Sequence, residues 1–275
     1  MDAVLPWPRG ATAPPPRDEK RRHAPHQRPR RPPATEGTRW IRGRARRRRT
    51  LPALLALLVA IAGIAAVAPA GSASAVAAGS GRATHYSLGP DGNTTNGNCS
   101  LPSIPAHRLY VAVGPDAYRG SAACGTYLDV TGPRGTVRVE VADLCPECGA
   151  QQLDLSEEAF RAIGDFDAGI IPISWKPVAA PTVPPLAFRL KEGSSAYWAA
   201  IQVVDAGTEV RSVEVRVGAR WVPLSRTTYG YWLASSGLGA GPYTVRVTDV
   251  TGRTATVPGV ALDPMRLQRT SARLG

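Results

Sequence analysis

Two aspartates, Asp143 and Asp154, stand eleven positions apart on either side of a turn that contains Cys-x-x-Cys. Asp143 ends a stretch of alternating apolar and polar residues, and Asp154 lies just before Ser156, where a helix is expected to begin. Two carboxyl groups held at one edge of a small β-fold suit the cleavage or the binding of sugars. Apolar neighbours are expected to raise the pKa of Asp154, as a proton donor requires. Helix capping by Asp154 and turn initiation by Asp143 are the structural alternatives, which spacing alone leaves open.

Hydroxyl-bearing residues occupy the first strand expected in this fold, at 82–86. Side chains alternate along a strand, so Thr84 and Tyr86 share one face and His85 takes the other. Thr84 and Tyr86 can therefore line a groove. The residue types by themselves slightly favour a core position for Tyr86 and a plain surface position for His85.

Aromatic residues stand out in the second half of the chain: Tyr197, Trp198 and Tyr229, with Lys191 nearby. Rings laid flat on a surface stack on the apolar faces of sugar rings. Neighbours in a regular strand point to opposite faces, so Tyr197 and Trp198 both face outward only if the chain turns after residues 193–195. Periodicity alone buries Trp198. Three further tryptophans are assigned to cores: Trp175, Trp221 and Trp232.

The elements that must position these residues divide into two β-domains. In the first, residues 79–178, strands are expected at 82–86, 107–113, 126–130, 136–143 and 170–178. One helix is evident, with Ser156 as its N-cap, Phe160 and Ile163 facing inward and Gly164 as its stop. Many short strands and one helix predict a small β-barrel.

A short linker with three prolines, residues 179–185, leads into the second domain, residues 186–263. Its strands are expected at 200–204, 210–217, 221–224, 231–234, 243–247 and 254–257. Even spacing without helical periodicity predicts a β-sandwich. Residues 264–275 are expected to be a frayed tail.

The net charge of +12 comes from 33 Lys and Arg against 21 Asp and Glu. Residues 1–75 carry +11 of it, and residues 76–275 carry +1. The folded region therefore lacks the positive surplus that phosphate binding requires, which excludes nucleic-acid binding as a function class.

The front end is typical of a targeting segment. Residues 1–50 are rich in Pro and Arg and are expected to be disordered. Residues 51–75 contain an apolar run that ends in Ala73-Ser74-Ala75, a pattern that predicts a secretory signal cleaved after Ala75, or as second choice after Ala78. An uncleaved membrane anchor is the alternative, which Pro52 and Pro69 make less favourable. We therefore expect a secreted, extracellular protein without stable membrane association.

All four cysteines follow this segment, and an even count in a secreted protein predicts disulfides. Of the three possible pairings we favour Cys99–Cys124 with Cys145–Cys148. A zinc site that uses Cys145 and Cys148 is the weaker alternative, because the chain has one close cysteine pair and not two. No metal and no cofactor are expected.

Seven segments carry a family pattern and occur in the same order as in that family: residues 81–84, 126–133, 141–147, 153–156, 159–161, 191–195 and 198–203. Together they resemble the bacterial expansins. That family combines a six-stranded double-psi β-barrel with an immunoglobulin-like sandwich that binds cellulose. The cysteine pattern resembles the actinobacterial branch, and Cys99–Cys124 resembles a disulfide of the plant relatives.

The resemblance implies roles for the barrel residues. Asp154 matches the family's essential aspartate, Asp143 the aspartate beside it, and Thr84 a groove threonine. Two positions depart from the pattern, because Cys145 replaces an expected groove tyrosine and Tyr86 replaces a second threonine.

In the sandwich, Trp198 and Tyr229 match two of three cellulose-stacking aromatics, and Tyr197 stands where the third is commonly Trp. Lys191 matches a lysine that contacts the polysaccharide. The resemblance thus replaces the core assignment of Trp198 with an exposed one.

The function that the resemblance implies is non-hydrolytic loosening of cellulose or a related wall polysaccharide by a monomer. Residues 84–88 contain no carboxylate that could activate water, which agrees with that expectation. The alternative is a glycan-cleaving enzyme, an endoglucanase or a peptidoglycan lytic transglycosylase, that uses Asp154 as its sole acid and base. A plain binding module with an inert barrel is the third possibility.

Overall fold

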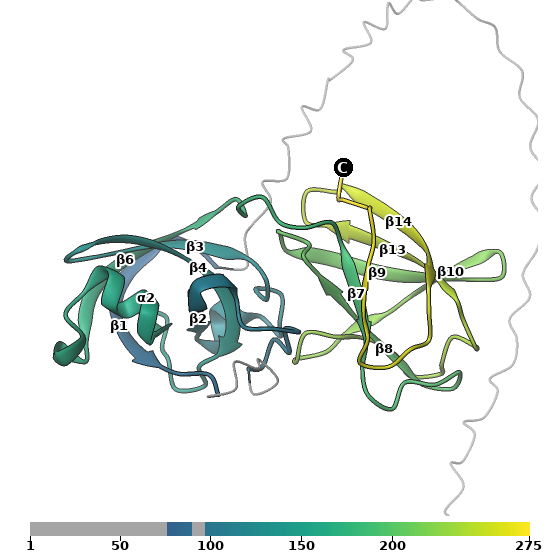
Figure 1. The fold of residues 1–275 in the computed structure, drawn as a ribbon, viewed down its shortest axis with the longest axis horizontal. Helices are drawn as coiled ribbons and strands as arrows, with labels where there is room; N and C mark the ends of the chain where they lie inside the picture. The colour runs from purple at the N-terminus through teal and green to yellow at the C-terminus, as the bar shows by residue number, and fades with distance from the viewer. Residues whose placement is uncertain (1–75, 90–96) are drawn as a thin grey trace, which may run out of the picture. The chain divides into compact units, whose positions relative to one another are not determined.

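The computed structural model describes residues 76–89 and 97–275 (Figure 1). The disordered region expected at 1–50 and the signal expected at 51–75 lie outside the described residues. Within the described part, no helix is both long enough and apolar enough to cross a bilayer.

Six strands close into a barrel in the order β1-β5-β2-β4-β3-β6. The pairs β1/β5 and β2/β4 are parallel and the remaining pairs are antiparallel. The alternation seen at 136–141 behaves as predicted, because Val137, Val139 and Val141 are buried in the barrel core. The strands are β1 (Gly79–Tyr86), β2 (Tyr110–Val113), β3 (Tyr127–Gly132), β4 (Gly135–Leu144), β5 (Gln152–Ser156) and β6 (Ile171–Val178).

The helix predicted after Ser156 is α2 (Glu157–Ile163). The Ser156 hydroxyl accepts a hydrogen bond from the backbone N–H of Ala159, and both Phe160 and Ile163 are fully buried. A four-residue helix, α1 (Pro115–Tyr118), was not expected. Two short 3₁₀ turns complete the helical elements of the described barrel, η2 (Ala106–Arg108) and η3 (Phe166–Ala168).

One barrel strand escaped the sequence analysis. Residues 152–156, expected to form the approach to a helix, are β5, which lies between β1 and β2. Leu153 and Leu155 enter the core while Asp154 points away from it. Five residues with only two apolar positions give too short an alternation to identify a strand.

The barrel core extends to the chain before β1. Val76 is buried, and the indole N–H of Trp175 donates to the carbonyl oxygen of Ala77 at 2.9 Å. Trp175 is therefore a core residue, as predicted. Gly79 is required beside it, since a Cβ at that position would lie 2.6 Å from the indole ring.

Two sheets pack face to face in the second domain, as predicted. A four-stranded sheet has the order β10-β9-β13-β14 and a five-stranded sheet the order β11-β12-β8-β7-β15. Strands β7, β11 and β15 were not expected. The strands are β7 (Ala187–Leu190), β8 (Ala199–Val204), β9 (Val210–Val217), β10 (Arg220–Pro223), β11 (Ser225–Arg226), β12 (Trp232–Ala234), β13 (Tyr243–Asp249), β14 (Thr254–Val260) and β15 (Leu267–Arg269).

Trp232 lies in the sandwich core as predicted, but the core assignment of Trp221 is wrong. Trp221 is partly exposed on β10, and the Arg246 guanidinium lies 4.2 Å from its ring centroid. Val222 packs against the core instead, paired with the buried Val215. A strand presents alternate residues to the core, so burial of Val222 turns Trp221 outward.

The expected frayed tail is also wrong. Residues 267–269 form β15, which pairs antiparallel with β7. Beyond it, the Ala272 carbonyl accepts from the Leu186 N–H at 2.8 Å, and Ala272 and Leu274 pack against the sandwich core. Apolar residues near the end of the chain thus complete the second sheet.

Both expected disulfides are present, Cys99–Cys124 with a Cα–Cα distance of 5.5 Å and Cys145–Cys148 with 5.3 Å. All four cysteines are paired, so none carries the thiolate that the zinc alternative requires.

Candidate functional site

The two aspartates of the sequence analysis lie on either side of β2. Asp154 on β5 and Asp143 on β4 are both register partners of the same residue, Ala112. Neighbouring strands are about 4.8 Å apart, so the two backbones are separated by roughly 10 Å. Two half-buried carboxylates with a small residue between them therefore lie on one side of the barrel, at the position of the groove that the family resemblance implies.

A β-bulge directs Asp143 into this groove. The β2/β4 register passes from Val111↔Val141 to Ala112↔Asp143, so β4 has one extra residue, Ala142. Without the bulge, Asp143 would point inward, as the buried Val141 does. The extra residue turns Asp143 to the side of Ala112, an effect that bulges commonly have near functional sites.

Asp154 is positioned by simple strand alternation. Leu153 and Leu155 are buried, so Asp154 faces outward, where the Thr84 hydroxyl on β1 donates to its Oδ1 at 2.7 Å. Partial burial raises the pKa of Asp154 above its ordinary value, while the Thr84 hydrogen bond and nearby His85 oppose the rise. The direction agrees with the prediction, and Thr84 and Asp154 form a direct pair.

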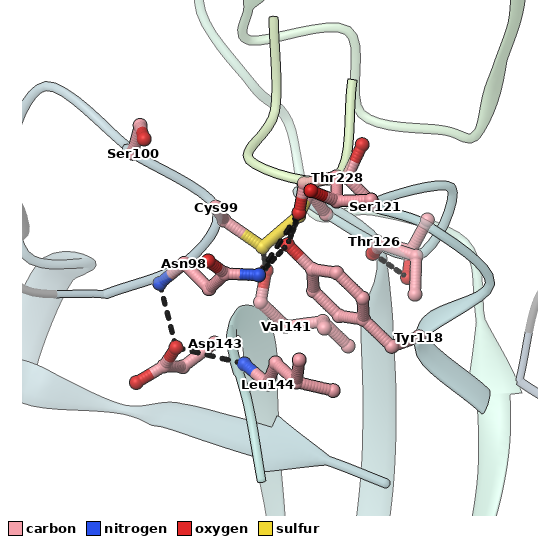
Figure 2. Close-up of a disulfide and its surroundings, with 12 residues drawn as sticks. Asn98, Cys99, Ser100, Tyr118, Ser121, Thr126, Val141, Asp143, Leu144 and Thr228 are labelled. Atoms are coloured by element: carbon pink, nitrogen blue, oxygen red, sulfur yellow. Dashed lines mark hydrogen bonds between the residues drawn. A yellow bond between two sulfur atoms is a disulfide. The ribbon is translucent and has the colours of Figure 1, made fainter. Parts of the chain in front are cut away.

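Asp143 is held by backbone donors. Its Oδ1 accepts from the N–H of Asn98 at 2.6 Å and from the N–H of Leu144 at 2.7 Å (Figure 2). Burial raises the pKa of Asp143, and these two donors together with Tyr86 oppose the rise. The carboxylate is therefore fixed in one orientation, and sequence reasoning missed Asn98 as the residue that fixes it.

Tyr86 enters the same site as Thr84, and His85 takes the opposite face, as predicted. The Tyr86 ring packs edge-on against Tyr110, with 5.5 Å between centroids. Its buried hydroxyl lies beside Asp143 but has no hydrogen-bond partner of ordinary geometry among the described residues. His85 is not a plain surface residue, because its ring stacks on Phe166 at 4.2 Å.

The aromatic residues of the sandwich gather beside the five-stranded sheet. Leu190 and Ala199 face the sandwich core, so alternation places their neighbours Lys191 and Trp198 on the outer face. The Lys191 ammonium lies 6.0 Å from the centroid of the Tyr229 ring. Tyr197, which is 85% exposed, stands next to them.

A turn before β8 makes this arrangement possible. The Ser195 N–H donates to the Trp198 carbonyl at 2.6 Å, and the strand begins only at Ala199. Gly237 packs directly against the backbone of this turn, because a Cβ at that position would lie only 2.5 Å from the Tyr197 Cα. Trp198 is partly exposed and outside the core, so the interpretation from periodicity alone is wrong and the one from the family resemblance is right.

Comparison with known proteins decides the family. A family model described as lytic transglycolase matches residues 78–175, and one described as expansin C-terminal domain matches residues 186–261. Expansin-YoaJ of Bacillus subtilis is 38% identical over 177 residues, which cover 63% of this chain and 74% of that protein. The chain belongs to the expansin family.

Other relatives of this expansin agree. Expansin-like protein 5 of Dictyostelium discoideum is 30% identical over 188 residues, covering 65% of this chain and 78% of its own. A mutant Clavibacter michiganensis expansin, crystallised in complex with cellohexaose, is 55% identical with a TM-score of 0.70 and covers 72% of this chain and 98% of its own. Expansins are in general non-hydrolytic.

The barrel and sandwich of this expansin belong to one compact unit and share several hydrogen bonds. Gln202 on β8 donates to the carbonyl oxygens of Cys99 and Ser100 at 3.1 and 2.7 Å, and Arg189 on β7 also donates to Ser100. Gln202 and Arg189 alternate with core residues, so they lie on the same outer face as Lys191 and Trp198.

The described part of this expansin contains no cluster of three or more His, Cys, Asp and Glu side chains that could hold a metal ion. Cys145 is joined to Cys148, so the position of the expected groove tyrosine supplies no hydroxyl. Tyr86, at the end of β1, brings a phenol beside Asp143 instead.

Proposed function

We propose that this expansin adsorbs to cellulose or a related wall glycan through Tyr197, Trp198 and Tyr229, which we call the aromatic platform. The exposure of Tyr197, at 85%, carries the proposal. An exposed ring beside two partly exposed rings is an apolar surface that a sugar chain can cover. The cellohexaose complex of the 55% identical Clavibacter expansin supports a β-glucan as the ligand class.

The groove of Thr84, Asp143 and Asp154 grips a second stretch of glycan and loosens its contacts with neighbouring chains. Carboxylate and hydroxyl groups at half-buried positions compete well for sugar hydroxyls, because burial strengthens each hydrogen bond. The Thr84–Asp154 pair at 2.7 Å presents a fixed acceptor surface and needs no reaction step.

Hydrolysis is disfavoured by the state of the second carboxylate. Inverting hydrolysis needs a base that activates water opposite the acid. Asp143 Oδ1 already accepts two backbone N–H bonds, which fix the carboxylate and occupy that oxygen, and residues 84–88 offer no other carboxylate. Asp154 thus resembles an acid without a suitable partner.

Action outside the cell is part of the proposal. Both disulfides are of a kind that persists in oxidising compartments and is rare in the cytosol.

Adsorption, wall extension and sugar release test the proposal together. Wild type, Trp198→Ala and Asp154→Asn are incubated with cellulose, xylan and peptidoglycan, and the bound fraction and new reducing ends are measured. Extension of wall strips under constant load is recorded in parallel. We expect Trp198→Ala to lose adsorption, and Asp154→Asn to adsorb normally but lose extension.

None of the three proteins should release reducing ends above background. Rapid Asp154-dependent release of reducing sugars from cellulose would establish an endoglucanase. Asp154-dependent release of soluble peptidoglycan fragments that have gained no water, detected by mass spectrometry because they carry no new reducing end, would establish a lytic transglycosylase. Unchanged wall extension by Asp154→Asn would show that the barrel groove plays no part in loosening, as the plain binding module with an inert barrel requires.

A further inference from the structure

Asn98 connects the barrel groove to the sandwich. Its backbone N–H donates to Asp143 Oδ1 at 2.6 Å, and its side-chain amide donates to the Thr228 carbonyl at 2.9 Å and to the Tyr118 hydroxyl at 3.1 Å (Figure 2). An amide NH₂ has two hydrogens, and both are used here. No other uncharged side chain of this size supplies two donors from one atom.

The sandwich end of this connection directly precedes the aromatic platform. Thr228 is followed by Tyr229, and the Tyr118 hydroxyl donates to the same Thr228 carbonyl at 3.0 Å. Gly230 lies so close to the barrel that a Cβ would stand 2.2 Å from the Cys99 carbonyl oxygen. The loop that presents Tyr229 is therefore seated on the backbone of Asn98 and Cys99.

A disulfide prevents Asn98 from moving independently. Cys99 is fully buried, its N–H donates to the Ala142 carbonyl at 3.2 Å, and its sulfur is bonded to Cys124. Ala142 is the bulge residue that directs Asp143 into the groove. The disulfide, the bulge and the Asn98 amide thus form one continuous support.

We propose that Asn98 is a positioning residue, which holds the groove carboxylate Asp143 at a fixed offset from the Tyr229 ring so that groove and platform engage the glycan together. The proposal rests on the proposed function, because it assigns the two surfaces to one ligand. Binding of one surface raises the effective concentration of the other only when the offset matches the ligand.

Ser121 offers a matched control. Its hydroxyl donates to the Thr227 carbonyl at 2.7 Å, so it also joins barrel to sandwich, but no hydrogen bond of Ser121 leads to Asp143. Ser121→Ala therefore removes a contact of the same kind without touching the groove. An effect seen in Asn98→Ala but absent in Ser121→Ala therefore comes from the positioning of Asp143, and not merely from the loss of a contact between barrel and sandwich.

Titration of Asp143 gives a readout without polysaccharide. The charged and titratable groups that face it are Tyr86 on β1, Tyr118 on α1 and Asp154 on β5, and all three stay in both variants. The Asn98 N–H lowers the pKa of Asp143, so loosening Asn98 should raise that pKa. Ser121→Ala should leave it unchanged.

The experiment compares wild type, Asn98→Ala and Ser121→Ala in cellulose adsorption, wall extension and carbon-13 NMR titration of Asp143. We expect adsorption within about twofold of wild type for both variants, since the platform remains. Extension should fall on the order of tenfold for Asn98→Ala and stay within about twofold for Ser121→Ala. Only Asn98→Ala should raise the pKa of Asp143.

Asn98→Asp is the second variant, in case Asn98→Ala melts early. It keeps the side-chain shape but sets an acceptor against the Thr228 carbonyl, so extension should fall as in Asn98→Ala. Equal losses of extension in Asn98→Ala and Ser121→Ala, or an unchanged Asp143 titration in Asn98→Ala, would overturn the proposal. Undiminished extension by Asn98→Asp would overturn it as well. Failure of the wild type to extend walls would instead refute the proposed function and would leave the Asp143 titration as a separate test of Asn98.

Discussion

Removal of the Tyr197 ring should weaken polysaccharide binding without changing the stability of the fold. A tyrosine side chain can bury roughly 150–250 Å², and stacking on a sugar covers about one third of that, some ~70 Å². At ~25 cal/mol per Å² this area is worth about 1.7 kcal/mol. Since about 1.4 kcal/mol corresponds to tenfold, Tyr197→Ala should weaken binding about 20-fold. Tyr197 is 85% exposed in the free protein. The free energy of unfolding of Tyr197→Ala should therefore differ from that of wild type by less than about 0.5 kcal/mol.

Adsorption isotherms on crystalline cellulose and calorimetric titration with a soluble cello-oligosaccharide measure the effect, and urea unfolding measures stability. Tyr197→Phe keeps the ring and serves as the matched control, with binding expected within about threefold of wild type. The reasoning fails if Tyr197→Ala binds as tightly as Tyr197→Phe. A large loss of stability would likewise show that the ring is held by the fold and is not free for a ligand.

Three further variants test the structure. Burial raises the pKa of Asp154, so the folded state binds the proton more tightly than the unfolded state does, whose pKa is about 3.9. The wild type therefore loses stability as pH rises above that value. Asp154→Asn should be more stable than wild type in urea at pH 7, and the difference should vanish below about pH 3. Replacing Cys99 and Cys124 together by Ala opens a loop with a sequence separation of 25 and should cost about 3.5 kcal/mol in urea unfolding under oxidising conditions. Gly237→Ala introduces a Cβ beneath the Tyr197 backbone at a φ of 73°, so both the melting temperature and cellulose adsorption should fall, and normal adsorption would show that the turn tolerates the shift.

Helices and strands whose signals lie within a few residues of one another in the sequence were predictable. Helix α2 has a Ser N-cap, acidic residues in its first turn and a Gly stop, and each acts within a few residues. Long alternation identified β4 in the same way. Strand β5 was missed because only Leu153 and Leu155 face inward, and β15 was missed because its pairing with β7 joins residues far apart in the sequence.

The site was predictable in its residues but not in its geometry. Asp143 and Asp154 meet because both pair with Ala112, and because a bulge at Ala142 reverses the direction of Asp143. No pattern in the sequence marks that bulge. The strand before which Trp198 lies was expected to begin at residue 200, but β8 begins at Ala199, which faces the core and so turns Trp198 outward. From the sequence, only the family resemblance supplied that outward position.

The contact between Trp175 and the chain before β1 constrains how a leader can be processed. A peptidase that cuts after Ala78 would take away the buried Val76 side chain and the Ala77 carbonyl that receives the indole proton, leaving a hole beside the first strand. A cut after Ala75 spares both groups. If the chain is exported, we expect protein sequencing of the product to begin at Val76, because a cut after Ala75 keeps both contacts and a cut after Ala78, three residues further on, removes them.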